Sequence, residues 1–311
     1  MKILVTGGAG FIASHVVDKY IELGHEVVVI DNLSTGVIEN VNSKAKFYHQ
    51  DICSPDILEV FKKEQPEIVN HHAAQISVPI SVKNPFLDLD VNGKGFLNIL
   101  ENCVKQNVKK VIFISSGGAI YGEASEYPTS ETYSPKPLSP YAIHKYLSEI
   151  YLHYYHEAFN LKYTVLRYAN VFGPRQISSS EAGVVSIFIE TLLNNKTPYL
   201  FTYPETVEGM VRDYIYVKDV VKANTFALDS ALYEAVNIGT GKETTTATLL
   251  KEICKQMNKE YAPIIGPPRP GDIKQSCLNV NKAKNVLNWQ AEYTLAEGIK
   301  ETVEFFKSKK K

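Results

Sequence analysis

The chain contains 311 residues, of which 44% are hydrophobic and 22% charged, and its formal net charge is −1. This size provides an ample core for one large or two modest domains, and the near-neutral balance excludes a general attraction to nucleic acid or acidic membranes. No apolar run approaches the roughly 18 residues of a membrane span, and glycines interrupt the first apolar run, so we expect no span, no signal peptide and a cytoplasmic location.

The N-terminus predicts a strand, a glycine turn, a helix and a second strand that ends in an acid. These elements are expected at residues 3–5, 11–23 and 26–30, with the acid at Asp31. Gly7 permits the tight turn, Gly10 lets the backbone approach a pyrophosphate, and Ala13 lets helix and strand pack closely. The helix offers its N-terminal N–H groups to the diphosphate. Because Asp31 can accept from a ribose 2′-OH and would repel a 2′-phosphate, the pattern predicts an NAD site.

Strands alternate with helices through the first half of the chain. The expected strands are ILVT, EVVVID, AKFYHQD, IVNHHA, VIFISS and TVLRYAN, with helices notably at 91–106 and 140–159. Such alternation predicts an α/β fold with a doubly wound parallel (Rossmann) sheet, whose ligands sit beyond the carboxyl ends of the strands. We expect an NAD-binding domain at 1–170, rejoined by about 212–238, in which 212–228 is a strand and a helix that return to the sheet. Because prolines become frequent after 170, we expect a smaller α/β substrate domain at 171–311.

Ser116, Tyr141 and Lys145 are the candidate catalytic residues. Ser116 closes an apolar strand, and Tyr141 and Lys145 lie four apart at the start of a helix for which Ser139 is the expected N-cap. An ammonium beside a phenol favours the phenolate, so a tyrosine with an ordinary pKa of about 10 could act as a base nearer neutrality. The same spacing at Tyr214 and Lys218 falls on an expected strand, where the two side chains cannot meet in this way.

The cysteines and paired histidines do not predict a metal site. Cys53, Cys103, Cys254 and Cys277 are scattered without metal-ligand spacing, so we expect reduced thiols. His71 and His72 are adjacent, unlike the two histidines of a helical metal motif.

Along nearly its whole length the chain resembles extended short-chain dehydrogenases/reductases, specifically the UDP-glucose (UDP-galactose) 4-epimerases. The matching segments are TGGAGFIASH, DNLSTG, HHAAQISVPISVKNP, VNGKGFLNIL, SSGGAIYGE, SPYAIHK, LRYANVFGPRQ, EAGVV, VRDYIYVKDV, NIGTG and RPGD. The resemblance implies an NAD-dependent enzyme that inverts C4 of a UDP-hexose through a 4-keto intermediate. It also implies a homodimer built on the 140–159 and 91–106 helices.

The resemblance also implies roles for individual residues. Ser116 would hydrogen-bond the reacting sugar oxygen, Tyr141 would be the acid/base, and Lys145 would bind the nicotinamide ribose. The expected cofactor contacts, besides Tyr141 and Lys145, are Gly7, Gly10, Phe11, Ile12, Asp31, Asn32, Leu33, Ser34, Thr35, Gly36, Asp51, Ile52, His72, Ala73, Ala74, Gln75 and Asn92. The expected substrate contacts, besides Ser116 and Tyr141, are Asn170, Val184, Val185, Tyr199, Phe201, Arg212, Arg269 and Asp272.

Several alternatives stay open at this point. Counting back from Tyr121 places the catalytic hydroxyl at Gly117, whereas counting along the strand places it at Ser116, which we prefer. The residues that follow, Gly118 and Ala119, lack the acids of related dehydratases, which disfavours dehydration. In the resembling family, the residue seven after the substrate arginine influences the room around C2 of the sugar. Here that residue is Ser276, which is small enough to leave open a UDP-N-acetylhexosamine substrate. UDP-glucuronate, a dTDP-sugar or a non-catalytic NAD-binding regulator on this fold are further alternatives.

Overall fold

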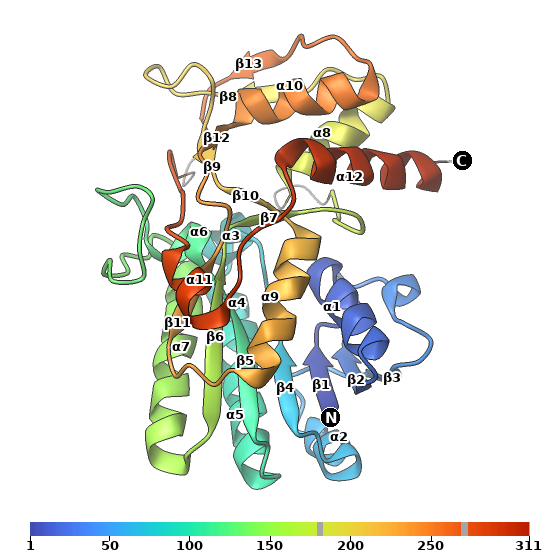
Figure 1. Ribbon diagram of the computed structural model, residues 1–311, viewed down its shortest axis with the longest axis vertical. Coiled ribbons are helices and arrows are strands. Elements are labelled where there is room, and N and C mark those ends of the chain that lie inside the picture. The colour runs from blue at the N-terminus through green and yellow to red at the C-terminus, as the bar shows by residue number, and fades with distance from the viewer. Residues whose placement is uncertain (179–182, 269–272, 311) are drawn as a thin grey trace.

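The computed structural model describes residues 1–178, 183–268 and 273–310. A sheet of seven strands has the order β11-β6-β5-β4-β1-β2-β3, and every neighbouring pair is parallel (Figure 1). The strands are β1 (Lys2–Thr6), β2 (Glu26–Asp31), β3 (Lys46–His49), β4 (Ile68–His71), β5 (Lys110–Ser116), β6 (Lys162–Tyr168) and β11 (Ala235–Ile238). From β1 the chain winds outward first through β2 and β3 and then through β4, β5 and β6. The doubly wound parallel sheet is therefore confirmed, with its switch point between β1 and β4.

Helices cover both faces of this sheet. They are α1 (Phe11–Glu22), α2 (Ile57–Glu64), α3 (Val78–Lys83), α4 (Pro85–Asp88), α5 (Phe96–Lys105), α6 (Gly117–Ile120), α7 (Pro140–Phe159), α9 (Val217–Asp229) and α11 (Asn281–Leu287), with a short 3-10 turn at Ile38–Asn40. Alternate strand residues face opposite ways, so Val5 packs in the core that α1 and α9 cover, while Leu4 packs in the core that α2, α5 and α7 cover. Burial on both faces explains why these strands are almost continuously apolar.

The remaining elements lie beyond the carboxyl ends of the sheet, at the top of Figure 1. They are β7 (Asn170–Phe172), α8 (Val184–Leu193), β8 (Tyr199–Phe201), β9 (Val211–Arg212), β10 (Tyr214–Tyr216), β12 (Thr244–Thr245), α10 (Thr246–Met257), β13 (Ile264–Gly266) and α12 (Leu295–Lys309). The short strands form two-stranded ladders, β10 with β7, β12 with β9 and β13 with β8. This arrangement places a second layer of structure over the edge of the sheet where ligands are expected.

Two elements differ from the sequence prediction. In the segment 212–228, the strand β10 pairs with β7 rather than with the main sheet, which β11 joins instead. The expected helix 91–106 begins as a π-helical segment, Leu89–Gly95, and becomes an α-helix only at Phe96. A Cβ on Gly95 would lie 2.8 Å from Ile52 Cδ1, so the wide turn lies directly against the segment after β3. The buried residues of this turn are Asn92, Gly93 and Gly95, which carry no large apolar side chain, so hydrophobic periodicity gave no signal for it.

Candidate active site

The glycine turn after β1 lies directly against the backbone of the segment after β4 and leads into the N-terminus of α1. Gly7 has φ +71°, and a Cβ there would lie 2.8 Å from the backbone nitrogen of Ala73. Gly10 is the N-cap of α1 without a side-chain cap, so the side chains leave the first N–H groups of the helix, at Phe11 and Ile12, to a ligand. This cradle has the chemistry of a diphosphate site.

The acid at the end of β2 ties the cradle to its neighbouring loop. Asp31 accepts from Ala9 N at 3.0 Å and from Leu33 N at 2.8 Å, which leaves the carboxylate further lone pairs for a ribose hydroxyl. Asn32 donates to Asp51 at 2.8 Å, and Ile52 is buried beside it. Burial opposes ionisation of Asp51, but hydrogen bonds from Cys53 N–H and from Asn32 lower its pKa. The other expected contacts of this loop, Ser34, Thr35 and Gly36, follow directly in the chain.

The segment after β4 faces the glycine turn across the switch point. His72 N donates to Thr6 O at 3.2 Å and Ala73 N donates to Thr6 Oγ1 at 3.2 Å. Among the described residues, the buried Nε2 of His72 has no hydrogen-bond partner, and burial together with the charge of Lys145 lowers the pKa of His72 to about 3. Gln75, two residues past Ala73, is held by Asn92, whose Oδ1 accepts from Gln75 N at 2.9 Å.

The three candidate catalytic residues converge at the carboxyl end of β5. Ser139 caps α7 by accepting from Ala142 N at 3.2 Å, which fixes the first turn that carries Tyr141. The Ser116 hydroxyl lies close enough to the Tyr141 hydroxyl to favour its ionised form. Lys145 Nζ donates to Ile114 O at 2.9 Å and lies 5.9 Å from the centre of the Tyr141 ring. Gly117, the alternative position for the hydroxyl, lies instead against Leu278, 2.6 Å from the Cβ it would carry.

The ionisation of this pair differs from the simple expectation. Burial raises the pKa of Tyr141 to about 12, although the Ser116 hydroxyl opposes the change and the charge of Asp88 adds to it. Burial also lowers the pKa of Lys145 to about 8 against the charges of Asp88 and Glu149. In the protein without ligands, burial therefore favours the neutral phenol of Tyr141 over its phenolate.

The expected substrate residues lie on the elements above the sheet. Asn170 begins β7, and its buried Oδ1 has no partner among the described residues, as a hydroxyl-binding acceptor requires. Val184 and Val185 begin α8, and the Tyr199 and Phe201 rings stack 6.3 Å apart on β8. Arg212 donates through Nη1 to Val211 O at 2.9 Å. Its neighbour Asp213 instead accepts from Thr240 and Gly241, so the two do not form a local pair. Arg269 and Asp272 lie outside the described residues.

Sequence reasoning missed the polar groups behind the catalytic residues. Arg167 donates to Glu149 through Nε at 3.0 Å and Nη2 at 2.5 Å, and Ser115 Oγ donates to the same carboxylate. Asp88 contacts His144 at 2.5 Å on the helix that carries Tyr141. These pairings join residues far apart in the chain, so spacing gave no signal for them.

Among the described residues no group of three or more His, Cys, Asp or Glu side chains could hold a metal ion, and no helix is long and apolar enough to cross a membrane.

The NAD dependent epimerase/dehydratase family model matches residues 3–239. The chain belongs to this family. It is 42% identical to the UDP-glucose 4-epimerase of Mycolicibacterium smegmatis, with 99% of each chain covered. The solved UDP-glucose 4-epimerase of Thermotoga maritima with UDP-glucose has 49% identity and a TM-score of 0.96 over the whole of both chains. That of Thermus thermophilus, in complex with NAD, has 44% identity and a TM-score of 0.94 over 99% of both. The glycine cradle, Asp31 and the unpartnered polar atoms fit NAD as the cofactor of this family member.

Proposed function

We propose that this family member is an NAD-dependent UDP-glucose 4-epimerase, which interconverts UDP-glucose and UDP-galactose and serves galactose metabolism. The observation that carries the proposal is the convergence of Ser116, Tyr141 and Lys145 at the carboxyl end of β5, where the charge of Lys145 also acts on His72 of the segment that faces the glycine turn. The similarity to the UDP-glucose 4-epimerases supports the choice of substrate.

Each catalytic side chain has a distinct task in this proposal. Tyr141, as the phenolate, takes the proton from the sugar 4-hydroxyl, and Ser116 donates a hydrogen bond to the same oxygen. Lys145 holds the nicotinamide ribose, and its ammonium favours the phenolate. The bound cofactor supplies a reversible hydride acceptor for C4. Between the two hydride transfers the sugar is a 4-ketose, which turns its other face before the carbon is reduced again.

The two layers of the molecule divide the binding of cofactor and substrate. We assign residues 1–170, rejoined by α9 and β11 of the 212–238 segment, to NAD, through the turn after β1, Asp31 and the 72–75 segment. The rest of residues 171–311 holds the nucleotide sugar, with α8 and β8 at the uridine and Arg212 at the diphosphate, and Asn170 at the boundary contacts the sugar. A planar guanidinium suits a diphosphate because it donates two parallel hydrogen bonds. Holding the diphosphate firmly leaves the hexose free to rotate.

UDP-N-acetylhexosamine is the second candidate substrate. A Cβ on Gly118 would lie 3.4 Å from Asn170 Oδ1 and 4.0 Å from Ser276 Oγ, so these residues surround one small space at the end of β5. A glycine and a serine there leave more room than larger residues would. Turnover with UDP-galactose should be compared with turnover on UDP-N-acetylgalactosamine, and faster conversion of the latter would reverse our preference.

We also propose that the enzyme is a cytoplasmic homodimer. The four cysteines are free, which suits a reducing compartment. Large apolar side chains are exposed along α7 and the adjoining α3–α4 turn, with Phe86 77% exposed, Val82 61% and Ile150 50%. Exposed apolar side chains of this kind on neighbouring helices are typical of an interface between subunits. Light scattering should give a dimer mass, and Ile150→Lys should give a monomer.

The test of the activity is incubation with UDP-glucose without added reductant, followed by chromatographic analysis for UDP-galactose. Tyr141→Phe should fold and retain NAD but lose most of the turnover, because the base is gone while the ring remains. Tyr154→Phe is the matched control, since Tyr154 lies on the same helix and is 55% exposed. Near-normal turnover by Tyr141→Phe would refute the assigned role. A protein that binds UDP-sugar yet never reduces its NAD would point to a regulator.

A further inference from the structure

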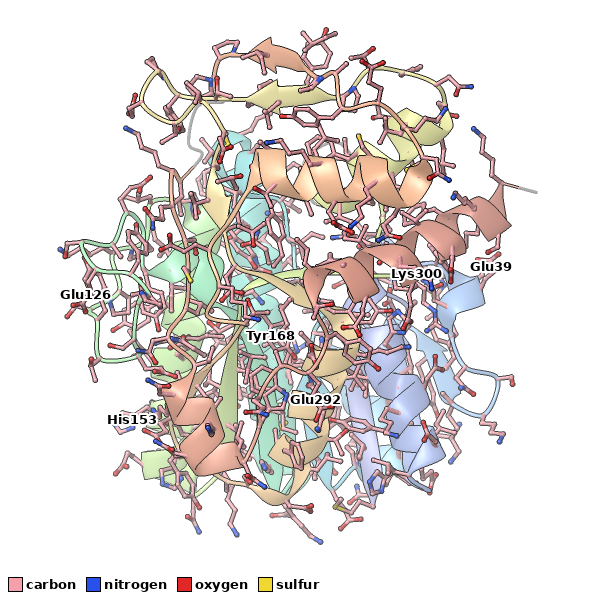
Figure 2. The ribbon with its side chains drawn as sticks, turned by 45° about the horizontal axis from the view of Figure 1, so that its top comes forward. Glu39, Glu126, His153, Tyr168, Glu292 and Lys300 are labelled. Carbon is pink, nitrogen blue, oxygen red and sulfur yellow. The ribbon has the colours of Figure 1, made fainter. Side chains whose placement is uncertain are left out.

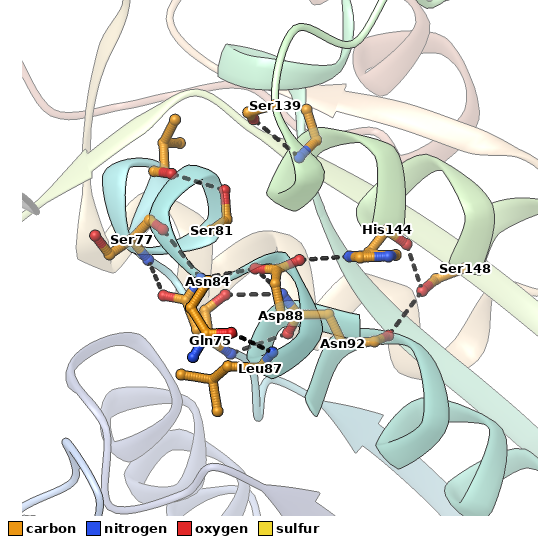
Figure 3. Close-up of polar contacts among 12 residues, drawn as sticks. Gln75, Ser77, Ser81, Asn84, Leu87, Asp88, Asn92, Ser139, His144 and Ser148 are labelled. Atoms are coloured by element: carbon orange, nitrogen blue, oxygen red, sulfur yellow. Dashed lines mark hydrogen bonds and ion pairs between the residues drawn. The ribbon is translucent and has the colours of Figure 1, made fainter. Parts of the chain in front are cut away.

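A buried hydrogen bond joins the catalytic helix to the segment before the π-helical turn (Figure 3). Asp88, the last residue of α4, has no exposed surface, and its Oδ1 lies 2.5 Å from Nδ1 of His144 on α7. A carboxylate offers only acceptors, so the Nδ1 of His144 carries the proton that is shared between them. His144 itself lies immediately before Lys145 and three residues after Tyr141.

The second oxygen of Asp88 holds the dinucleotide segment. Asp88 Oδ2 accepts from Gln75 Nε2 at 2.6 Å and from Asn92 Nδ2 at 3.1 Å. Asn92 in turn binds both backbone groups of Gln75, accepting from its N–H and donating to its C=O at 2.9 Å each. Figure 3 shows these contacts meeting at Asp88 from both sides. One carboxylate therefore connects the segment expected at the dinucleotide with the helix expected to carry the base.

The connection runs along the π-helical turn. Asp88 immediately precedes Leu89–Gly95 and Asn92 lies at its centre, and a hydrogen bond connects their side chains. Ser148, one turn beyond His144 on α7, also donates to His144 O at 2.8 Å and to Asn92 O at 3.5 Å. The wide turn and α7 thus meet along two successive turns of α7. Single π-helical turns of this kind occur frequently at functional sites.

Stability alone gives a weak reason for a carboxylate at this place. Burying a charged group is costly, and well-packed apolar residues often give equal or greater stability. Asp88 has a second effect because its charge raises the pKa of both Tyr141 and Lys145. The carboxylate is therefore close enough to the catalytic pair for its charge to influence the ionisation of both side chains.

We propose that Asp88 and His144 are positioning residues that hold the start of α7, with Tyr141 and Lys145, in register with the dinucleotide segment at Gln75. This inference rests on the proposed function. It adds a requirement that the two halves of the site stay aligned through one buried carboxylate. Misalignment of reacting groups by about 1 Å can cost on the order of 100-fold in rate.

The test compares His144→Ala with His144→Asn. Asparagine places its amide nitrogen where the Nδ1 of histidine lies, so it restores a donor to Asp88 that alanine removes. We expect His144→Ala to lower kcat for UDP-glucose on the order of 10- to 100-fold with KM unchanged, because the uridine and diphosphate contacts lie on other elements. We also expect it to lose NAD during gel filtration, whereas His144→Asn should recover most of both properties. His153→Ala is the matched control, because His153 is exposed on the same helix (Figure 2).

Asp88→Asn provides the second arm, with Asp90→Asn as its control. Asp90 lies two residues away and pairs with Lys94 at the surface, so its loss should change neither NAD retention nor turnover. Asp88→Asn should reproduce the defects of His144→Ala, and if it fails to fold, the two His144 variants decide the matter. Wild-type NAD retention by His144→Ala, or equal impairment of His144→Ala and His144→Asn, would overturn the proposal. If the wild-type protein converts no UDP-glucose, the proposed function fails, while NAD retention still tests the pair.

Discussion

Removal of the Arg167 guanidinium should destabilise the fold strongly, because it would strand a buried carboxylate. Arg167 and Glu149 are only 5% and 8% exposed, and within the described part of the chain two of the three donors to Glu149 come from Arg167. Leaving one member of a buried ion pair without its partner costs about 3–5 kcal/mol, and little solvent is present here to reduce that cost. Arg167→Met should therefore lower the free energy of unfolding by this amount. Arg167→Met/Glu149→Met should recover most of it, since neither charge is then buried alone.

The assay is urea unfolding followed by far-UV circular dichroism at a fixed, saturating NAD concentration, because bound cofactor adds to apparent stability. The control is Lys19→Met, which breaks an exposed pair with Glu22 at 2.8 Å on α1. Such surface pairs contribute about 0–1 kcal/mol. A loss below about 1 kcal/mol for Arg167→Met, or a double variant as unstable as the single one, would show that the pair is not an isolated buried charge pair.

Three further predictions concern the site itself. Gly7→Ala should abolish NAD retention on gel filtration, since its Cβ would meet Ala73 N at 2.8 Å and φ is +71°; retained NAD would contradict the cradle. Ser116→Ala should lower kcat with little change in melting temperature, and Ser115→Ala, which loses a buried bond to a carboxylate, should do the reverse. In NAD-stripped protein, ultraviolet difference titration against Tyr141→Phe should show no phenolate from pH 7 to about 10, because burial raises the pKa of Tyr141 to about 12. Adding NAD should lower that pKa, and an NAD-independent neutral titration would contradict this.

Local patterns predicted the cofactor half of the molecule well. The helix expected at 11–23 is observed at Phe11–Glu22, and the strand expected at 26–30 is observed at Glu26–Asp31. Glycine geometry and hydrophobic runs of four to six residues act over short distances, so a sequence carries them plainly. The strand expected near Tyr214 exists, but its partner is β7. Pairing depends on the whole fold, and three residues of alternating pattern cannot specify it.

The polar contacts behind the site could not be predicted in the same way. Asp88 and His144 are 56 residues apart, and Ser115 and Arg167 reach the same carboxylate on α7 from two different strands. These residue types are common in protein sequences and form no local motif here, and only the fold brings them together. The tandem serines at the end of β5 have different partners on α7. Ser115 donates to Glu149, whereas Ser116 lies beside Tyr141 at the start of that helix.

The ionisation of Tyr141 shows why spacing alone gives an incomplete account of catalysis. Lys145 is four residues away as predicted, yet burial raises the pKa of the phenol to about 12. Bringing that pKa to neutrality needs roughly 7 kcal/mol of differential interaction, more than one partly neutralised ammonium provides. An oxidised nicotinamide ring is cationic and a reduced one is not. A bound oxidised nicotinamide would therefore lower the pKa of Tyr141 and populate the phenolate that accepts the sugar proton, and reduction of the ring would raise that pKa again, so that the phenol would keep the proton until it is returned with the hydride.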